Sequence, residues 1–446
     1  YNPKDPVSGF AGIPRNMTGL AEHMKAAGYA THQVGKWDAG MATPDHTPRG
    51  RGYDTSLGYF HHANDYWTSQ AGQFIDLWDT DRPAYGVNGS APPPWHRPKG
   101  TWREEDYEEY KFKNRVLGII SKHDTSVPLF MCYCFHIVHE PLEVPQRTYA
   151  EFTPMADDYV TQGLHHRHTY QAMVKYMDDV IGEIVALLQQ RAMWANTLVV
   201  FQTDNGGPSF LGSSHTANNY PLKGSKATNW EGGIRGNAFV SGGFLQRHAP
   251  QRVGTKLEGY THICDWYATF AALAGVDPVD RKATAAGLPP IDSLNLWPYI
   301  SGAESASPRT EIFADPQVLI MGDWKVVDST GVELGGACWM GPRYPNASAD
   351  PSCQRQEPCG ATGGCLYNVK EDPGEHVNLA ASLPRKLEEL KQRLLELQPT
   401  VFSPTRYGGD GALPTYFARE VYHGYWGPFI FASSPEHPPE PAGLVI

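Results

Sequence analysis

Residues 197–207 read Thr-Leu-Val-Val-Phe-Gln-Thr-Asp-Asn-Gly-Gly, and this stretch decides the fold that we expect. Its first six residues are mostly apolar or β-branched without alternation, which is typical of a parallel-sheet strand with helices over both faces. Apolar residues at helical spacing over 170–188 predict an amphipathic helix directly before it. A helix, a buried strand and a polar cluster at the strand's carboxyl end indicate a doubly wound α/β sheet, whose ligands bind at that end.

The same kind of unit recurs toward the N-terminus. Residues 18–27 predict a helix, and 29–34 predict a strand that leads to Lys36. Residues 129–138 predict a central strand that stops before Pro141, because proline cannot continue the pairing. The polar residues behind these strands are therefore expected to gather at one edge of the sheet.

Two segments of the chain lack this pattern. Residues 53–100 are rich in aromatic residues, proline and glycine with little periodicity, which predicts a long loop over a surface or a cleft. After about residue 301, short strand candidates, a cysteine-rich loop and an amphipathic helix over 384–397 follow one another. We therefore expect a doubly wound mixed α/β sheet flanked by helices over 1–300, and a smaller α+β subdomain over 301–446.

The composition fits a large folded protein and argues against two kinds of partner. A chain of 446 residues with 41% hydrophobic and 19% charged residues can bury a sizeable core. Its 37 basic and 48 acidic side chains give a net charge of −11 without a long basic run, so nucleic acid is not an expected partner. The longest nearly apolar stretch, 127–138, is too short for a membrane span.

Cysteines and glycosylation signals favour an oxidising, extracytoplasmic setting, either secreted or lysosome-like. Four of the seven cysteines fall in a short Gly- and Pro-rich stretch where disulfides could staple loops, with unpaired thiols as the alternative. Three Asn-x-Ser/Thr sequons fit a secretory route, although such tripeptides also arise by chance. These residues are Cys338, Cys353, Cys359 and Cys365, and Asn16, Asn88 and Asn346.

Two further cysteines, Cys132 and Cys134, lie in the expected strand 129–138. We interpret them as buried small apolar residues that face opposite sides of the strand rather than as a disulfide. No Cys-x-x-Cys pair occurs in the chain, which argues against a structural zinc site.

Asp204 and Asn205 are the strongest local signal for a metal ion. Two adjacent oxygen ligands followed by two glycines let the backbone turn tightly around a hard cation, calcium or magnesium rather than zinc. A type I′ turn, in which Asn-Gly is also favoured, explains the same residues equally well. Both interpretations stay open on spacing alone.

Basic side chains follow the expected strands as well. Lys36 and Asp38 follow the first of these strands, His139 follows the second, and Lys226 and Arg235 come soon after 203–207. Lysine is a compact charge suited to a tetrahedral oxyanion, and histidine can donate to a substrate oxygen or act as an acid. Solvated surface lysines and a structural histidine are the alternatives for each residue taken alone.

Together these segments resemble the sulfatase family, especially arylsulfatases of the arylsulfatase B type. The resemblance implies the alkaline-phosphatase-like α/β fold with a small C-terminal domain. It covers most of the chain. The matching segments are 28–37 (ending in Gly-Lys-Trp), 49–54 (Arg-Gly-Arg-Gly-Tyr-Asp), 138–145 (Val-His-Glu-Pro-Leu-Glu-Val-Pro), 203–207, 221–226 (Pro-Leu-Lys-Gly-Ser-Lys) and 230–236 (Trp-Glu-Gly-Gly-Ile-Arg-Gly), with 366–368, 372–375 and 378–379 late in the chain.

The resemblance implies roles for five residues of this sequence. Asp204 and Asn205 fall on calcium ligands, and Lys36 and Lys226 fall on lysines that bind the sulfate group. His139 falls on the histidine that contacts the sulfate ester. A divalent cation and two lysines would neutralise a sulfate group held for in-line attack.

The sequence departs from the family pattern in two places. The family nucleophile is a formylglycine made from the first residue of a Cys/Ser-x-Pro-x-Arg motif, and no cysteine of this chain begins one. That motif and an acidic pair of calcium ligands are expected upstream of Tyr1. The second departure is Asp38, which stands where the family usually has a histidine that manages the proton of the formylglycine hydrate. We keep Asp38 as a candidate catalytic residue because a buried carboxylate can act as a base.

The expected function is calcium-dependent hydrolysis of a sulfate ester on an aryl compound or a carbohydrate. The enzyme class is a sulfuric ester hydrolase that needs a formylglycine-generating enzyme for its maturation. Two alternatives are a phosphoester hydrolase on the same fold and a catalytically inactive sulfatase-like binding protein. A two-metal phosphoester hydrolase would prefer Asp-His where this chain has Asp204 and Asn205.

Overall fold

The computed structural model describes residues 12–85, 103–152, 166–209, 217–328, 339, 359, 363–401 and 412–431. The strands are β1 (Ala30–Lys36), β2 (Thr55–Tyr59), β3 (Gln70–Ala71), β4 (Phe74–Ile75), β5 (Trp78–Asp79), β6 (Arg82–Pro83), β7 (Leu129–Cys134), β8 (Val199–Gln202), β9 (Ala238–Ser241), β10 (Glu311–Asp315), β11 (Val318–Met321), β12 (Trp324–Val327) and β13 (Cys365–Asn368). The α-helices are α1 (Leu20–Ala26), α2 (Glu108–Lys122), α3 (Gln146–Ala150), α4 (His166–Gln190), α5 (Glu231–Ile234), α6 (Gly243–His248), α7 (Asp265–Leu273), α8 (Arg281–Ala285), α9 (Trp297–Ser301), α10 (Pro384–Leu397) and α11 (Ala412–Tyr416).

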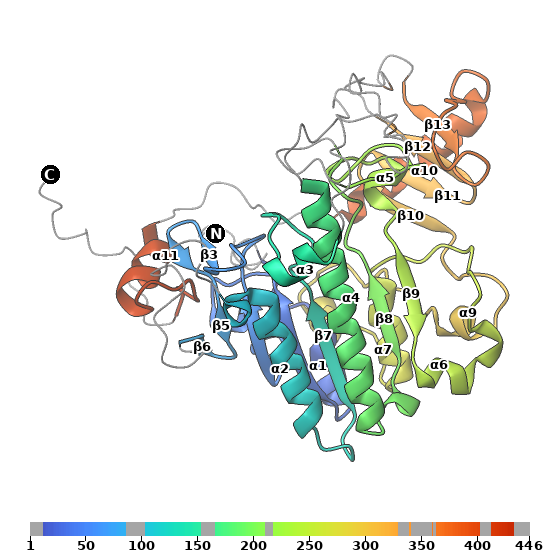
Figure 1. Ribbon diagram of the computed structural model, residues 1–446. Helices are drawn as coiled ribbons and strands as arrows, with labels where there is room; N and C mark the ends of the chain where they lie inside the picture. Colours follow the sequence, from blue (N-terminus) through green and yellow to red (C-terminus); the bar gives the residue numbers. More distant parts are fainter. Residues whose placement is uncertain are drawn as a thin grey trace, which may run out of the picture.

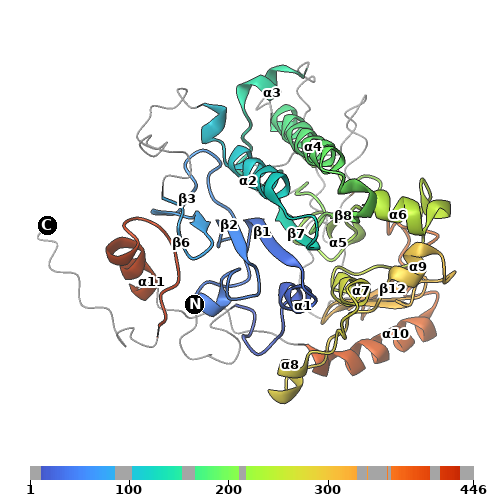
Figure 2. The ribbon, with the colours of Figure 1, turned by 90° about the horizontal axis from the view of Figure 1, so that it is seen from below.

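The central sheet has the strand order β6-β5-β2-β1-β7. β1 pairs in parallel with both β2 and β7, whereas β5 and β6 are antiparallel additions at one edge. α2 and α4 cover one face of this sheet and α1 and α7 lie on the other (Figures 1 and 2). The fold is therefore the expected mixed α/β sheet between two layers of helices.

Apolar side chains of α2 and the sheet form the largest part of the core. Val34 of β1, Leu57 of β2 and Phe112 and Val116 of α2 are each at most 1% exposed and belong to one cluster. The apolar spacing over 18–27 marks buried Met24, and that over 170–188 marks buried Leu188 but also Val174, which is 39% exposed. The helices begin and end within a few residues of those bounds, at the positions where capping and frayed turns decide the assignment.

The expectation of a long loop over 53–100 is wrong at its start. β2 lies inside the main sheet, with Gly58 beside Gly35 of β1. A Cβ atom on Gly58 would lie 1.9 Å from the carbonyl oxygen of Gly35, so the close approach of the two strands requires glycine there. The pattern was missed because a five-residue strand with a glycine in it shows no clear periodicity. Residues 86–102 lie outside the described part of the chain.

The strand expected over 197–202 has an antiparallel neighbour in the described residues, where a parallel one was expected. β8 pairs antiparallel with β9, with Val199 opposite Ser241, and its four residues are half-buried rather than buried. An apolar run indicates that other elements can cover the faces of a strand, but it does not determine which strand pairs with it. In the described residues one edge of β8 faces a cavity instead of a neighbouring strand.

The C-terminal part of the chain adds a second sheet. β10, β11, β12 and β13 form an antiparallel sheet, and α10 packs on it through buried Leu387, Leu390 and Leu394. The bounds of α10 are those that leucine spacing predicts. The segment with α11 then returns to the first part of the fold, where the Trp426 amide donates to the Ile75 carbonyl at 2.8 Å (Figure 1). The division of the chain at residue 300 stays a prediction.

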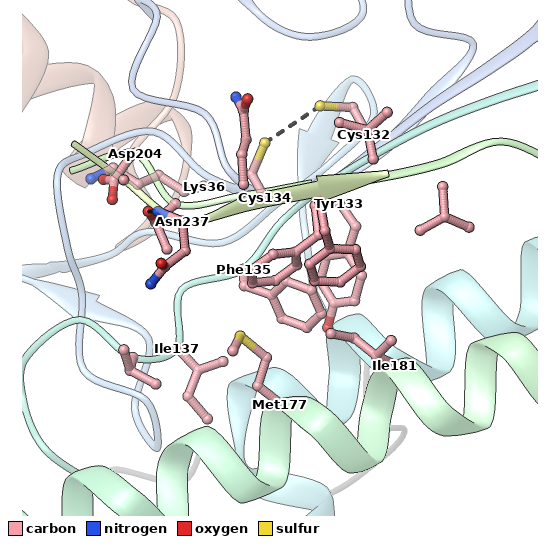
Figure 3. A pocket seen from close by; sticks show the side chains of 18 of the residues that line it. Lys36, Cys132, Tyr133, Cys134, Phe135, Ile137, Met177, Ile181, Asp204 and Asn237 are labelled. Carbon is pink, nitrogen blue, oxygen red and sulfur yellow. Dashed lines mark hydrogen bonds between the residues drawn. The ribbon is translucent and has the colours of Figure 1, made fainter. Parts of the chain in front are cut away.

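The structure shows a disulfide for one pair of cysteines, does not describe a second pair, and contradicts the expected orientation of a third. Cys359 and Cys365 form a disulfide, whereas Cys338 and Cys353 lie outside the described residues. The interpretation that Cys132 and Cys134 face opposite sides is wrong: their sulfur atoms lie 3.5 Å apart (Figure 3). Residues two apart in a strand share a face, so both thiols point the same way.

Two expectations concern the surface and the membrane. Of the three sequons, Asn16 is exposed, and Asn88 and Asn346 lie outside the described residues. No helix in the described part of the chain combines the length and apolar character that a bilayer crossing requires.

Candidate active site

Lys36 is the last residue of β1, at the edge where the parallel strands end. Its ammonium lies 3.6 Å from the Asp38 carboxylate, and its side chain is 24% exposed. The turn after β1 is held by the Trp37 indole N–H, which donates to the carbonyls of Gly40 and His46, each at 2.9 Å. Lys36 and Asp38 are thus fixed at the strand end by the backbone on both sides.

His139 lies in the loop that follows β7. Its Nδ1 lies 2.8 Å from the Glu140 carbonyl, which can only accept, so Nδ1 carries the proton and Nε2 is the acceptor in the neutral ring. Burial lowers the pKa of His139, and the positive charges of Lys226 and Lys36 lower it further. A lowered pKa favours the neutral ring of His139.

A buried carboxylate beneath this loop fixes its course. Oε1 of Glu109 accepts the amide N–H groups of His136 and Ile137 at 2.7 and 2.9 Å, and Oε2 accepts the Tyr133 hydroxyl at 2.9 Å. Burial raises the pKa of Glu109 to about 7. α2 therefore sets the position of the loop that carries His139.

Lys226 is held by the turn that follows β8. Its amide donates to the Gly207 carbonyl at 3.2 Å, and the Gly206 amide donates to the Gly233 carbonyl at 2.9 Å. A Cβ atom at Gly206 would lie 1.7 Å from the Gly232 carbonyl oxygen, so only glycine allows this packing. The turn 203–207, Lys226 and α5 form one hydrogen-bonded unit.

A buried ion cluster ties this unit to the C-terminal sheet. Lys325 of β12 contacts Glu231 of α5 at 3.0 Å and Glu375 at 2.8 Å, and the Glu231 amide donates to Glu375 at 2.8 Å. The Lys325 and Glu375 side chains are fully buried and that of Glu231 is 5% exposed. The second sheet thus supports the loop that carries Lys226.

Asp204 and Asn205 follow β8 directly. Oδ1 of Asp204 accepts the Asn205 amide at 2.9 Å, and the Asn205 side chain donates to the Gly206 carbonyl at 2.8 Å, as in a local turn. Carboxylate and amide oxygens suit calcium, which takes six to eight oxygen ligands. Across the described residues no group of three or more His, Cys, Asp or Glu side chains could hold a metal ion. The pair therefore fits part of a calcium site and cannot complete one.

One cavity of about 2920 Å³ brings these groups together. Figure 3 shows Lys36, the last residue of β1, near Asp204, which follows β8, with Asn237 beside them. The structure thus assembles the polar groups that the strand-end argument predicts at one place. The predicted site residues that line the cavity are Lys36, Asp38, His139, Asp204, Asn205 and Lys226.

The structure adds one residue to the cavity lining and one contact beside it that the sequence reasoning did not connect with the site. Asn237 lines the cavity just before β9, and its amide donates to the Thr203 hydroxyl at 2.9 Å. The antiparallel pairing of β8 with β9 places it there, and no motif pointed to that pairing. His62 approaches from the loop after β2, with Nδ1 2.7 Å from Oδ2 of Asp38. This contact with Asp38 could not be expected from the sequence, because β2 was not predicted.

The comparison with known families decides the identity of this fold. The profile of the family described as Sulfatase matches residues 2–276, which is more than half of the chain. This chain belongs to the sulfatase family. Membership makes it a sulfuric ester hydrolase by class, on the mixed α/β fold that the sequence predicts.

Similar proteins agree with the sulfatase assignment. The chain is 28% identical over 445 residues to mouse arylsulfatase J, an alignment that covers 94% of this sulfatase and 67% of the relative. It is 26% identical to human arylsulfatase A, with 91% and 77% covered. The crystal structure of the PsFucS1 sulfatase from Pseudoalteromonas sp. has a TM-score of 0.60 at 19% identity, covers 90% of this chain and 79% of its own, and shows the same fold.

Proposed function

We propose that this chain forms the body of a calcium-dependent sulfatase that hydrolyses a sulfate ester of an aryl compound or a carbohydrate. One observation carries the proposal: Lys36, His139 and Lys226, which come from three separate segments of the chain, line one cavity. Two ammonium groups and an imidazole suit the tetrahedral, anionic sulfate group, which needs charge stabilisation when its S–O bond breaks.

Each of these residues has a distinct part in the proposed reaction. Lys36 and Lys226 bind and orient the sulfate oxygens, and their fixed positions keep them aligned without rearrangement during the reaction. Nε2 of His139 faces the ester as hydrogen-bonding partner of a sulfate or bridging oxygen. A formylglycine, when present in the complete protein, would supply the nucleophilic hydroxyl group beside these residues.

The cavity leaves room for a further strand beside the described residues. Within the described residues β7 is paired only with β1, and β8 only with β9, so one edge of each strand faces the cavity. Apolar side chains of α4, among them Met177 and Ile181, lie along the same space (Figure 3). Its volume of about 2920 Å³ exceeds the roughly 300–1,000 Å³ of a small-molecule pocket.

A β-strand inserted between β7 and β8 would pair both open edges and cover these apolar side chains. β7 leads to His139 and β8 leads to Asp204, so the two strands end on the same side of the sheet. A strand that runs parallel to them would deliver the residues after it to Lys36 and Asp204. We propose that this strand carries the formylglycine and the remaining calcium ligands.

The proposal places the protein in an extracytoplasmic compartment, secreted or lysosome-like, as a glycoprotein. The Cys359–Cys365 disulfide and the exposed sequon at Asn16 support this setting. A formylglycine-generating enzyme is then a partner during maturation.

Titration with inorganic sulfate tests the anion site without a need for turnover. Sulfate should shift the imidazole NMR signals of His139, and Lys36→Ala or Lys226→Ala should weaken binding at least tenfold each. Lys256→Ala is the matched control, because Lys256 is 78% exposed and pairs with Glu258 away from the cavity. Equal binding by all four proteins would contradict the assignment.

Two alternatives give different results in substrate assays. A phosphoester hydrolase would cleave an aryl phosphate faster than the matching aryl sulfate, and it would prefer a histidine where this chain has Asn205. A binding protein would take up sulfated ligands and release no sulfate.

A further inference from the structure

His62 and Asp38 form a carboxylate–imidazole pair beside the cavity. We propose that His62, held by Asp38, is the proton-transfer group of this site. The inference rests on the proposed sulfatase function and supplies the imidazole that position 38 lacks. It follows from the topology of two strands, from the anchoring of two loops and from the proton that each nitrogen of the ring can carry.

The register of β1 and β2 brings the two residues together. Lys36 lies opposite Tyr59 in the parallel pair, and the Trp37 amide donates to the Tyr59 carbonyl at 2.9 Å. Asp38 comes two residues after Lys36 and His62 three residues after Tyr59. Since both strands end at the same edge, the two side chains meet, and Nδ1 of His62 lies 2.7 Å from Oδ2 of Asp38.

The backbone at Asp38 is specialised for this contact. Its φ of 48° lies in the left-handed region, which Asp tolerates better than most residues. The carboxylate faces Lys36 at 3.6 Å and His62 at 2.7 Å. Asp38 lines the cavity itself and so connects His62 to the groups that surround it.

The loop that carries His62 is anchored on its other side by a buried carboxylate. Asp76 is fully buried and accepts the amides of Phe60 and His61 at 2.9 and 2.8 Å, as well as Nδ1 of His61 at 2.7 Å. Burial opposes the charge on His61, but its hydrogen bond to Asp76 and the charge of Asp76 raise the pKa of His61. Two neighbouring histidines are therefore held by two carboxylates, and His62 is the more exposed of them, at 80% of its side chain against 37% for His61.

The contact with Asp38 fixes which nitrogen of His62 can react. A carboxylate only accepts hydrogen bonds, so Nδ1 of His62 carries a proton and Nε2 keeps its lone pair when the ring is neutral. Nε2 has no hydrogen-bond partner among the described residues. Nε2 can take the proton of a reacting hydroxyl group: the O–H bond breaks, an N–H bond forms, and the Asp38 carboxylate stabilises the imidazolium.

The returning step releases the proton from Nε2 to water or to the leaving oxygen and restores the neutral ring. His139 is less suited to this task. Burial and the charges of Lys226 and Lys36 lower its pKa and disfavour an imidazolium there. The site thus separates anion binding at His139 from proton transfer at His62.

The tautomer of His62 can be measured in the chain whether or not it is active. Selective ¹⁵N labelling of histidine, with His62→Gln to assign the signals, should show neutral His62 protonated at Nδ1. Asp38→Asn should convert a large share of it to the form protonated at Nε2. An Nε2-protonated ring in the wild type, or no change in Asp38→Asn, would overturn the pairing.

The second measurement is the rate of aryl sulfate hydrolysis by the complete, formylglycine-bearing enzyme. His62→Ala should lower kcat about 10²–10⁴-fold, and added imidazole should restore part of the rate, because the exposed position admits a free imidazole molecule. Sulfate affinity should stay within about twofold, since the lysines remain in place. His248→Ala, an exposed histidine at the end of α6, is the matched control and should keep the wild-type rate.

The outcomes separate this inference from the proposed function. A wild type that releases no sulfate refutes the proposed function, and the tautomer measurement then still decides the pairing of His62 with Asp38. A wild type that turns over while His62→Ala keeps its rate, or loses it without rescue by imidazole, refutes the role of His62 alone.

Discussion

Replacing Lys325 by methionine should strongly destabilise the protein. Methionine keeps most of the side-chain length and removes the ammonium group that lies 2.8 Å from Glu375 and 3.0 Å from Glu231. Both carboxylates stay buried, and a buried ion pair that loses one partner costs about 3–5 kcal/mol. Since a folded domain is stable by about 5–15 kcal/mol, the variant loses a large part of its free energy of unfolding.

Urea denaturation followed by tryptophan fluorescence measures this effect. Trp230 is a local probe, because it is buried beside Tyr367 in the cluster next to α5. Lys370→Met is the matched control: its ammonium lies 3.9 Å from Asp323 and its side chain is 69% exposed, so the change should stay below about 1 kcal/mol.

A third variant separates lost charge from lost packing. Lys325→Met combined with Glu231→Gln and Glu375→Gln removes the uncompensated charges and should recover much of the stability. If Lys325→Met alone costs less than about 1 kcal/mol, or if the triple variant is no more stable than the single one, the account of this cluster is wrong.

Three further predictions concern a buried acid, the disulfide and the calcium ligands. The folded pKa of Glu109, raised to about 7, lies above its ordinary value of 4.5, so the stability that Glu109 contributes is fully present below about pH 4.5 and is lost as the pH rises to about 7. Glu109→Gln should flatten that dependence by up to about 1.4 kcal/mol per pH unit in urea unfolding, and an unchanged slope would contradict the burial argument. Cys359→Ser with Cys365→Ser opens a loop of a few residues and should lower the free energy of unfolding by about 2 kcal/mol, whereas an unaltered midpoint would show that the bridge does not constrain the unfolded chain. Asp204→Ala with Asn205→Ala should weaken calcium binding at least tenfold in calorimetry of the complete protein, and wild-type affinity would remove the pair from the metal site.

The sequence predicts the layers of the fold because helix periodicity and capping are local. The helix over 384–397 matches α10 residue for residue, since its leucines face the second sheet. β2 and the pairing of β8 with β9 could not be predicted, because short strands are defined by neighbours that lie far away in the sequence. For this reason the central strand β2 could not be recognised in the aromatic and glycine-rich sequence over 53–100.

The same reason separates the site residues that the sequence predicts from those that it does not. Lys36, His139 and the pair Asp204–Asn205 follow strands directly, so the carboxyl-end argument places them together from the sequence. Asn237 lines the cavity and His62 contacts Asp38 because of strand pairings that leave no pattern in the sequence. The departure at Asp38 was visible in the sequence, but the histidine that contacts it became visible only in the structure.

Sulfate release by the complete protein tests the central claim most directly. The native coding sequence upstream of Tyr1 should be read, and its full product expressed with a formylglycine-generating enzyme and assayed on a chromogenic aryl sulfate. We predict a Cys/Ser-x-Pro-x-Arg motif and calcium-dependent release of sulfate that Lys36→Ala and Lys226→Ala abolish. A protein that binds sulfate and releases none, or that keeps its rate without both lysines, would contradict the account.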